Sequence, residues 1–217
     1  MGLLEKVAFI TFEGGEGVGK STQVRRLADW LLDRGRAVTV TREPGGTPGA
    51  ECVRHVLLSG RAEPLGTEME AVLFAAARRD NVERMIRPAI DAGHVVLCDR
   101  YMDSSRVYQG AVGGVSDAFM TTLERAVTEG ARPDLTLVFD LDVERSMERL
   151  AERGAGQGDR YERESGDAHE RRREAFLELT EREPERCKLI RADRTPSDVF
   201  ESVLDAVRPV LSGAENA

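Results

Sequence analysis

Short apolar segments alternate along the chain with longer segments whose apolar positions recur every three or four residues. The short segments are rich in β-branched and aromatic residues, a composition that favours buried strands. They cover residues 7–12, 37–41, 94–98, 135–139 and 187–192. The longer segments predict helices over residues 23–33, 50–58, 67–92, 115–130, 143–152, 165–183 and 197–211. This alternation predicts an α/β fold in which five parallel strands form a sheet flanked by helices.

Local signals indicate where some of these helices begin and end. Thr67 and Glu70 have the spacing of a capping box, and Ser197 suits the N-cap of the last helix. Pro88 lies inside the long helical pattern of residues 67–92. Because proline lacks an N–H group and crowds the preceding turn, we expect it to end or kink that helix.

The sequence between the first strand and the first helix matches the phosphate-loop pattern G-x-x-x-x-G-K-[ST]. Glycines let the backbone turn its N–H groups towards phosphate oxygens, and the helix N-terminus adds partial positive charge. Lys20 would bind the β- and γ-phosphates, and the Ser21 hydroxyl would ligate Mg²⁺. A glycine-rich turn with an exposed lysine is the alternative, but the flanking strand and helix favour a nucleotide site. The expected contacts are Gly14, Gly15, Glu16, Gly17, Val18, Gly19, Lys20, Ser21 and Thr22.

Charged residues follow two of the other predicted strands. Asp99 and Arg100 end the strand at residues 94–98, where a phosphate-loop protein carries the Walker B aspartate that holds Mg²⁺. A plain strand-ending turn is the alternative there. Arg42 and Glu43 follow the strand at residues 37–41, at the edge where open α/β sheets bind ligands. Solvated loop charge explains these two residues equally well.

Residues 149–163 combine three glycines with Arg149, Arg153, Arg160 and Arg163. A glycine-hinged, arginine-rich segment predicts a closing lid, since arginine suits phosphate contacts. A disordered charged loop is the alternative. The arginine run at residues 171–173 is interpreted as a solvated helix face.

Composition limits the function classes. The 217 residues fit one domain, residues 1–217, with a small lid at 149–163 and a frayed tail at 212–217. No stretch is apolar for long enough to span a membrane, and the start of the chain lacks a signal-peptide pattern. The net charge of −8 argues against a nucleic-acid partner. Three scattered cysteines predict no disulfide framework and suit a reducing cytoplasm.

Three further stretches are specific to one family. They read T-R-E-P-G-G-T at residues 41–47, D-R-Y-x-x-S-x-x-x-Y-Q-G at 99–110 and P-D-L-T-L at 133–137. With the phosphate loop they make the chain closely similar to bacterial thymidylate kinases over residues 7–207. The resemblance implies a three-layer P-loop NTPase fold, like that of nucleoside-monophosphate kinases, with a small lid. It also implies transfer of the γ-phosphate of ATP to dTMP with Mg²⁺, by a cytoplasmic homodimer without a nucleic-acid or membrane partner.

The resemblance also implies roles for residues at the acceptor. Glu16 would accept a hydrogen bond from the sugar 3′-hydroxyl, and Arg100 would bind the acceptor phosphate, with Arg42 nearby. Phe74 would stack on thymine and Arg78 would bond its O4 edge, although their spacing alone fits a core residue beside a surface charge. The residues that would shape the base pocket are Ser104, Ser105 and Gln109.

Some members of the family carry a basic residue where this chain has Gly17. The chain therefore resembles the other type, in which lid arginines act beside Lys20 and Arg100 in catalysis. Arg153 and Arg160 are the candidates, with Arg149 nearer the adenine. The lid is about two residues longer than the family pattern, at residues 155–158. Two alternatives remain open: another nucleotide or nucleoside kinase of the same fold, and an ATP-dependent switch or binding module.

Overall fold

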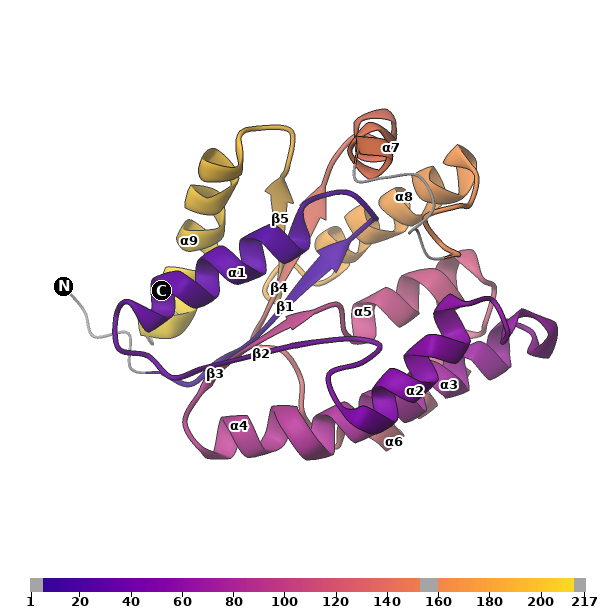
Figure 1. Ribbon diagram of the computed structural model, residues 1–217, viewed down its shortest axis with the longest axis horizontal. Coiled ribbons are helices and arrows are strands. Elements are labelled where there is room, and N and C mark those ends of the chain that lie inside the picture. Colours follow the sequence, from indigo (N-terminus) through magenta and orange to yellow (C-terminus); the bar gives the residue numbers. More distant parts are fainter. Residues whose placement is uncertain (1–5, 153–159, 213–217) are drawn as a thin grey trace.

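All five predicted strands form, and they pair in one parallel sheet (Figure 1). The structure is a computed structural model that describes residues 6–152 and 160–212. The strand order is β2-β3-β1-β4-β5, and all four strand pairs are parallel, as predicted. The strands are β1 Phe9–Gly14, β2 Val38–Arg42, β3 Val95–Asp99, β4 Leu135–Asp140 and β5 Cys187–Arg191.

Helices connect these strands and lie on both faces of the sheet (Figure 1). The α-helices are α1 Lys20–Leu32, α2 Pro48–Leu58, α3 Thr67–Asn81, α4 Arg87–Asp91, α5 Met102–Ser105, α6 Asp117–Thr128, α7 Val143–Glu152, α8 Gly166–Arg182 and α9 Pro196–Ser212. A short 3₁₀ turn covers Glu63–Leu65, and π-helical segments cover Val82–Ile86 and Arg106–Val112. Across the described residues, none of these helices has the length and apolar character needed to cross a membrane.

Alternating side chains of the central strand belong to two separate cores. Ile10 and Phe12 are buried with residues of α1 and α9, which lie together on one face of the sheet (Figure 1). Phe9 is buried on the opposite face, with Val82 and Ile86 of the first π-helical segment. Successive strand side chains point to opposite faces, so burial on both faces requires the near-continuous apolar strands that the sequence shows.

Pro88 does not end the long helix predicted over residues 67–92, but a π-helical segment precedes it. The helix runs on as α3, the π-helical Val82–Ile86 and α4. The Arg87 N–H bonds to the Val82 carbonyl oxygen, which is five residues earlier rather than four. This wider turn relieves the crowding that a proline ring causes in a regular α-helix.

Two of the predicted helix caps are wrong. Gly66 is the N-cap of α3 and provides no side-chain bond, so Thr67 and Glu70 form no capping box. The Glu70 carboxylate binds Arg160 instead. At α9 the cap is Thr195, whose Oγ1 accepts from the Asp198 N–H at 3.2 Å, and not Ser197. α1 also begins three residues earlier than expected, at Lys20, because the helix follows directly from the phosphate loop.

The register of the sheet brings the candidate residues together at one edge. Asp99 at the end of β3 lies beside Phe12 of β1 and Arg42 of β2. The loops that follow β1, β2 and β3 therefore meet at the carboxyl edge, where α/β sheets bind their ligands.

Candidate active site

The phosphate loop links β1 to α1 at this edge (Figure 1). Gly14 and Gly17 have φ angles of 126° and 71°, in the region that favours glycine. A Cβ added at Gly14 would collide with the Phe139 carbonyl oxygen, and one added at Gly17 would collide with that of Ser146. Glycine at these two positions therefore lets the loop lie directly against β4 and α7.

Lys20 lies folded over the phosphate loop. Its Nζ donates to the Gly14 carbonyl oxygen at 3.1 Å, and its side chain is almost completely buried. Burial and the nearby Arg100 guanidinium together lower the pKa of the Lys20 ammonium to about 8, although Asp99 and Glu16 oppose the shift. A bound phosphate would favour the charged ammonium and so raise this pKa again.

Ser21 and Asp99 form the part of the site that suits a metal ion. The Ser21 Oγ donates to Asp99 Oδ2 at 2.8 Å. A hydroxyl and a carboxylate are hard oxygen ligands of the kind that Mg²⁺ prefers. Within residues 6–152 and 160–212, no group of three or more histidine, cysteine or acidic side chains could hold a metal. The donor set therefore fits an ion that keeps most of its ligands as water and substrate phosphate, as Mg²⁺ does.

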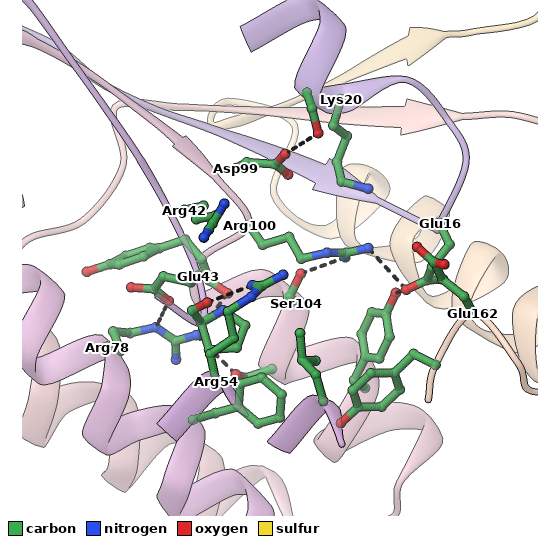
Figure 2. Close-up of a pocket in the computed structure, with 18 of the residues that line it drawn as sticks. Glu16, Lys20, Arg42, Glu43, Arg54, Arg78, Asp99, Arg100, Ser104 and Glu162 are labelled. Atoms are coloured by element: carbon green, nitrogen blue, oxygen red, sulfur yellow. Dashed lines mark hydrogen bonds and ion pairs between the residues drawn. The ribbon is translucent and has the colours of Figure 1, made fainter. Parts of the chain in front are cut away.

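Arg100 connects the end of β3 to the phosphate loop. Its φ angle is 68°, which is uncommon for a residue with a side chain. Its backbone N–H donates to the Phe12 carbonyl oxygen, and its Nη1 donates to the Gly14 carbonyl oxygen at 2.9 Å. Its Nη2 contacts Glu16 Oε1 at 3.1 Å (Figure 2). Backbone strain of this kind is concentrated at functional sites, where the surrounding structure holds it in place.

Glu13 supports the turn around Arg100 and was not predicted as a site residue. Its fully buried carboxylate accepts from the Tyr101 N–H at 2.7 Å and from the Ser104 hydroxyl at 2.6 Å. The Ser104 hydroxyl in turn accepts from Arg100 at 3.1 Å. Burial and the Asp103 charge raise the pKa of Glu13 to about 7, although the hydrogen bond from Ser104 opposes this shift. The sequence feature that could have indicated Glu13 is the presence of a glutamate at the end of a buried strand.

A cavity of about 270 Å³, called here the site cavity, lies beside the phosphate loop (Figure 2). Its wall contains residues of the phosphate loop, the loop after β2, α3 and the helical segments after β3. The predicted site residues that line it are Glu16, Gly17, Lys20, Ser21, Arg42, Phe74, Arg78, Asp99, Arg100, Ser104, Ser105 and Gln109. The structure thus brings part of the predicted phosphate loop into one space with the predicted acceptor residues. The loop residues Gly14, Gly15, Val18, Gly19 and Thr22 do not line this cavity.

Arg78 is a buried residue of this cavity, so the alternative of a surface charge is wrong. Its Nε donates to Glu43 Oε2 at 2.7 Å, and its Nη2 donates to the Tyr101 carbonyl oxygen and the Ser105 hydroxyl (Figure 2). Burial raises the pKa of Glu43, although the Arg78 charge opposes that shift. Glu43 therefore orients the guanidinium, and it is a buried partner rather than a solvated loop charge.

Aromatic side chains form another part of the wall. The Phe74 ring lies 6.5 Å from the Tyr161 ring, which is perpendicular to the Tyr108 ring at 5.2 Å between centroids. All three tyrosines of the chain line the site cavity. Tyr108 lies in the polar stretch of residues 103–114, whose hydrogen-bonding side chains suit a small polar ligand, but Tyr101 and Tyr161 were not predicted as site residues. The scarcity of tyrosine in a strongly charged sequence was the signal that could have indicated them.

Glu16 lies where the phosphate loop meets this aromatic wall. Its Oε1 accepts from Arg100 and from the Tyr108 hydroxyl. His169 Nδ1 lies 3.4 Å from Oε2, but this oxygen is buried without a hydrogen-bond partner. Burial acts to raise the pKa of Glu16, and the nearby His169, Arg100 and Lys20 outweigh it and hold the pKa well below its usual range. The carboxylate is therefore ionised.

The lid arginines do not line the site cavity within the part of the chain that the structure describes. Arg149 donates to the Ala192 carbonyl oxygen at 3.2 Å, and Arg160 binds the Glu70 carboxylate, with Nη2 at 2.7 Å from Oε2. Arg153 and residues 155–158 lie outside the described residues, as does the tail at 213–217.

The interpretation of residues 171–173 as a solvated helix face is wrong. Arg171 is exposed, but Arg172 is only 3% exposed and Arg173 pairs with Asp140 at 2.6 Å. Arg172 and Arg173 therefore face the rest of the protein, where they pair with Glu164 and Asp140.

A phosphate loop on a five-stranded parallel sheet, beside a cavity lined by arginines and aromatic rings, defines a kinase of the P-loop NTPase fold. The comparison with protein families gives the particular group. The sequence model described as "Thymidylate kinase" matches residues 12–203. The chain belongs to the thymidylate kinase family.

Individual relatives agree with this membership. The proteins named thymidylate kinase from Bradyrhizobium sp. strain BTAi1 and from Bradyrhizobium diazoefficiens are each 49% identical over 204 residues, covering 94% of this chain and 90% of theirs. The crystal structure of thymidylate kinase from Ehrlichia chaffeensis has a TM-score of 0.74 at 30% identity, and the match covers 94% of this chain and 99% of that one. The predicted family, fold and enzyme class are confirmed.

The Lys20 environment predicts that binding of a nucleoside triphosphate takes up protons above about pH 8. Below that pH Lys20 is already charged, so the affinity for ATP should not change with pH. Above it, the affinity for ATP should fall by up to about ten-fold per pH unit. Calorimetry with ATP at about pH 8.5, in buffers of different ionisation enthalpy, would measure the uptake.

The matched control is Lys20→Arg, whose guanidinium stays charged, so its proton uptake should disappear. Buffer-independent heats for the unmodified protein at this pH would contradict the prediction.

Proposed function

We propose that this chain transfers the γ-phosphate of ATP to dTMP, producing dTDP for dTTP synthesis. One observation supports this most directly. The site cavity is lined both by Lys20 of the phosphate loop and by the pair Phe74 and Arg78, which suits a nucleobase. The names of the relatives agree with this acceptor.

The acceptor nucleotide would occupy the site cavity. Thymine would stack on Phe74 and receive a hydrogen bond at O4 from Arg78, which Glu43 holds in place. The residues that would limit the pocket around the 5-methyl group are Ser104, Ser105 and Gln109. The sugar 3′-hydroxyl would bind Glu16, whose buried Oε2 has no hydrogen-bond partner and would gain one. Arg100 would hold the acceptor phosphate, with Arg42 at the cavity mouth.

The donor triphosphate would lie on the backbone of residues 14–22. Lys20 would move from the loop carbonyls to the β- and γ-phosphates, and Arg149 would lie near the adenine. Ser21 and Asp99 would hold Mg²⁺, whose charge neutralises phosphate oxygens when it is bound.

The reaction needs positioning and charge neutralisation more than covalent help from the protein. An oxygen of the acceptor phosphate attacks the γ-phosphorus in line, and the bond to the β-phosphate oxygen breaks. Arg100 orients the attacking phosphate and Lys20 stabilises charge on the transferring group. No protein base is needed, because a phosphate monoester with a second pKa of about 6 is largely ionised at neutral pH.

The acceptor assignment predicts a strong preference for dTMP. ADP release with MgATP should be greatest with dTMP and lower with dUMP, which lacks one methyl contact worth about 1–3 kcal/mol. Turnover with dCMP, dGMP, thymidine or no acceptor should be close to background. Phe74→Ala should raise the dTMP KM about 10- to 100-fold, because a base stacked on an aromatic ring contributes about 1–3 kcal/mol.

Phe200→Ala is the matched control, since it removes the same ring from α9, away from the site cavity. Equal turnover with every acceptor, or with none, would contradict the assignment to dTMP.

We also propose that residues 149–163 form the lid of a single kinase domain spanning residues 1–217. The collision of any Cβ at Gly17 with the Ser146 carbonyl oxygen leaves no room there for a basic side chain. This supports a catalytic role for lid arginines. Arg160 would exchange its partner Glu70 for the transferring phosphoryl group when the lid closes over ATP and excludes water.

The lid assignment predicts a selective loss of kcat. At least one of the single variants Arg153→Ala and Arg160→Ala should lower kcat about 100-fold or more. The reason is that an arginine at a transferring phosphoryl group contributes about 10³–10⁵ in rate. The dTMP KM should change little. Arg163→Ala, which removes an exposed arginine of the same segment, is the control. Unchanged kcat in both test variants would exclude the proposed role.

A homodimer is proposed as the working form. Large apolar side chains are exposed within a short stretch of the chain. They are Val56 in α2, Leu65 in the 3₁₀ turn and Met69 in α3. Sedimentation at micromolar concentration should give a dimer, and Met69→Asp should dissociate it by placing a charge in an apolar interface.

Leu189→Asp is the control for the dimer, because Leu189 is an exposed apolar residue of β5, at the opposite edge of the sheet from β2. A monomeric unmodified protein would contradict the proposal. We place the reaction in the reducing cytoplasm, in agreement with the free thiols of Cys52, Cys98 and Cys187.

A further inference from the structure

Arg172 is a buried arginine that the phosphoryl-transfer mechanism does not use. It lies on α8 at 3% exposure, and it is not among the described residues that line the site cavity. Removing a guanidinium from water costs several kcal/mol unless other groups compensate. The groups around it therefore indicate what its charge does.

Two tyrosine rings lie against the guanidinium. Its central carbon is 4.5 Å from the centroid of the Tyr108 ring and 5.3 Å from that of the Tyr161 ring. The two rings are perpendicular to each other, with an interplanar angle of 89°, and both line the site cavity. Arg172 therefore contacts from behind the aromatic rings that substrate would contact from the cavity.

Two carboxylates complete its surroundings. Nη2 binds Glu164, which comes just before α8, and Nη1 lies 4.0 Å from Glu16 Oε2. Nη1 and Nε are buried without hydrogen-bond partners, and so is Glu16 Oε2. The arginine thus connects the end of the segment that carries Tyr161 and Glu164 to the acidic residue of the phosphate loop.

We propose that Arg172 is a positioning residue for the acceptor pocket, which holds Tyr108, Tyr161 and Glu16 in the arrangement that binds the sugar of the acceptor nucleotide. This inference rests on the proposed function. The guanidinium lies within cation–π distance of both rings, and its charge attracts Glu16. With Arg172 absent, the Tyr108 ring loses the guanidinium packed against it and Glu16 keeps only His169 beside it from α8, so the sugar site loosens.

The test compares Arg172→Met and Arg172→Lys with the control Arg171→Met. Methionine keeps much of the length without the charge, lysine keeps the charge without the planar group, and Arg171 is the exposed neighbour on the same helix. Steady-state kinetics with dTMP and ATP, the dissociation constant of dTMP alone and thermal unfolding are measured for each variant. The same kinetics with the ribonucleotide counterpart of dTMP measure sugar selectivity.

We expect Arg172→Met to raise the KM and the dissociation constant for dTMP at least ten-fold, with the ATP KM and the kcat at saturation within about three-fold of the unmodified enzyme. Arg172→Lys should show a smaller increase, and Arg171→Met none. Preference for dTMP over its ribonucleotide counterpart should fall in Arg172→Met, which a loss of stability alone would not cause. If Arg172→Met does not fold, Arg172→Lys decides the question. A dTMP KM raised more than two-fold, with reduced preference for dTMP over its ribonucleotide counterpart, would then support the role of Arg172.

One result would overturn the role of Arg172 alone, and another would overturn the proposed function as well. A folded Arg172 variant whose dTMP KM and selectivity stay within two-fold of the unmodified enzyme would overturn the role of Arg172 alone. Absence of dTMP phosphorylation by the unmodified enzyme would overturn the proposed function, and this inference with it.

Discussion

One half-buried guanidinium, that of Arg100, holds the ends of β1 and β3 together at the edge of the sheet. It contacts the Gly14 carbonyl oxygen and the Glu16 carboxylate, and Glu13 supports its turn through Ser104. Removing one partner of a buried ion pair typically costs about 3–5 kcal/mol, because the other charge is left uncompensated. The phosphate loop and Arg100 therefore behave as one unit, and the rest of the site is built around it.

Buried acids accompany the cations of the site. Glu43 orients Arg78, Glu16 pairs with Arg100, and Asp99 lies close enough to Lys20 to oppose the fall in its pKa. Donors that are held in position before substrate binds need little reorganisation during the reaction, and this is a main source of electrostatic catalysis. The net charge of −8 is a property of the whole chain and does not describe this cavity, whose lining contains nearly as many acidic as basic side chains.

Two irregular helical segments place side chains of the site cavity. The π-helical Val82–Ile86 follows α3, which carries Phe74 and Arg78. The π-helical Arg106–Val112 carries Tyr108 and Gln109 into the cavity wall. π-Helical turns are uncommon and are often found at functional sites, where they shift side chains relative to a regular helix. In this chain they adjust the helices on one side of the acceptor pocket.

The sequence by itself determined the five strands, their parallel arrangement, the phosphate loop and the roles expected of Ser21 and Asp99, because these depend on neighbouring residues and on periodicity. Its motifs also identified the family. Only the tertiary structure decided which charges are buried together. Glu13 precedes the phosphate loop and Glu43 lies inside the motif at residues 41–47, but both became site residues only through contacts with distant segments. Arg172 resembles Arg171 in sequence, yet folding places it beside Glu16, which is 156 positions away along the chain. Local pattern cannot encode this difference, because burial of a charge depends on the elements that pack around it.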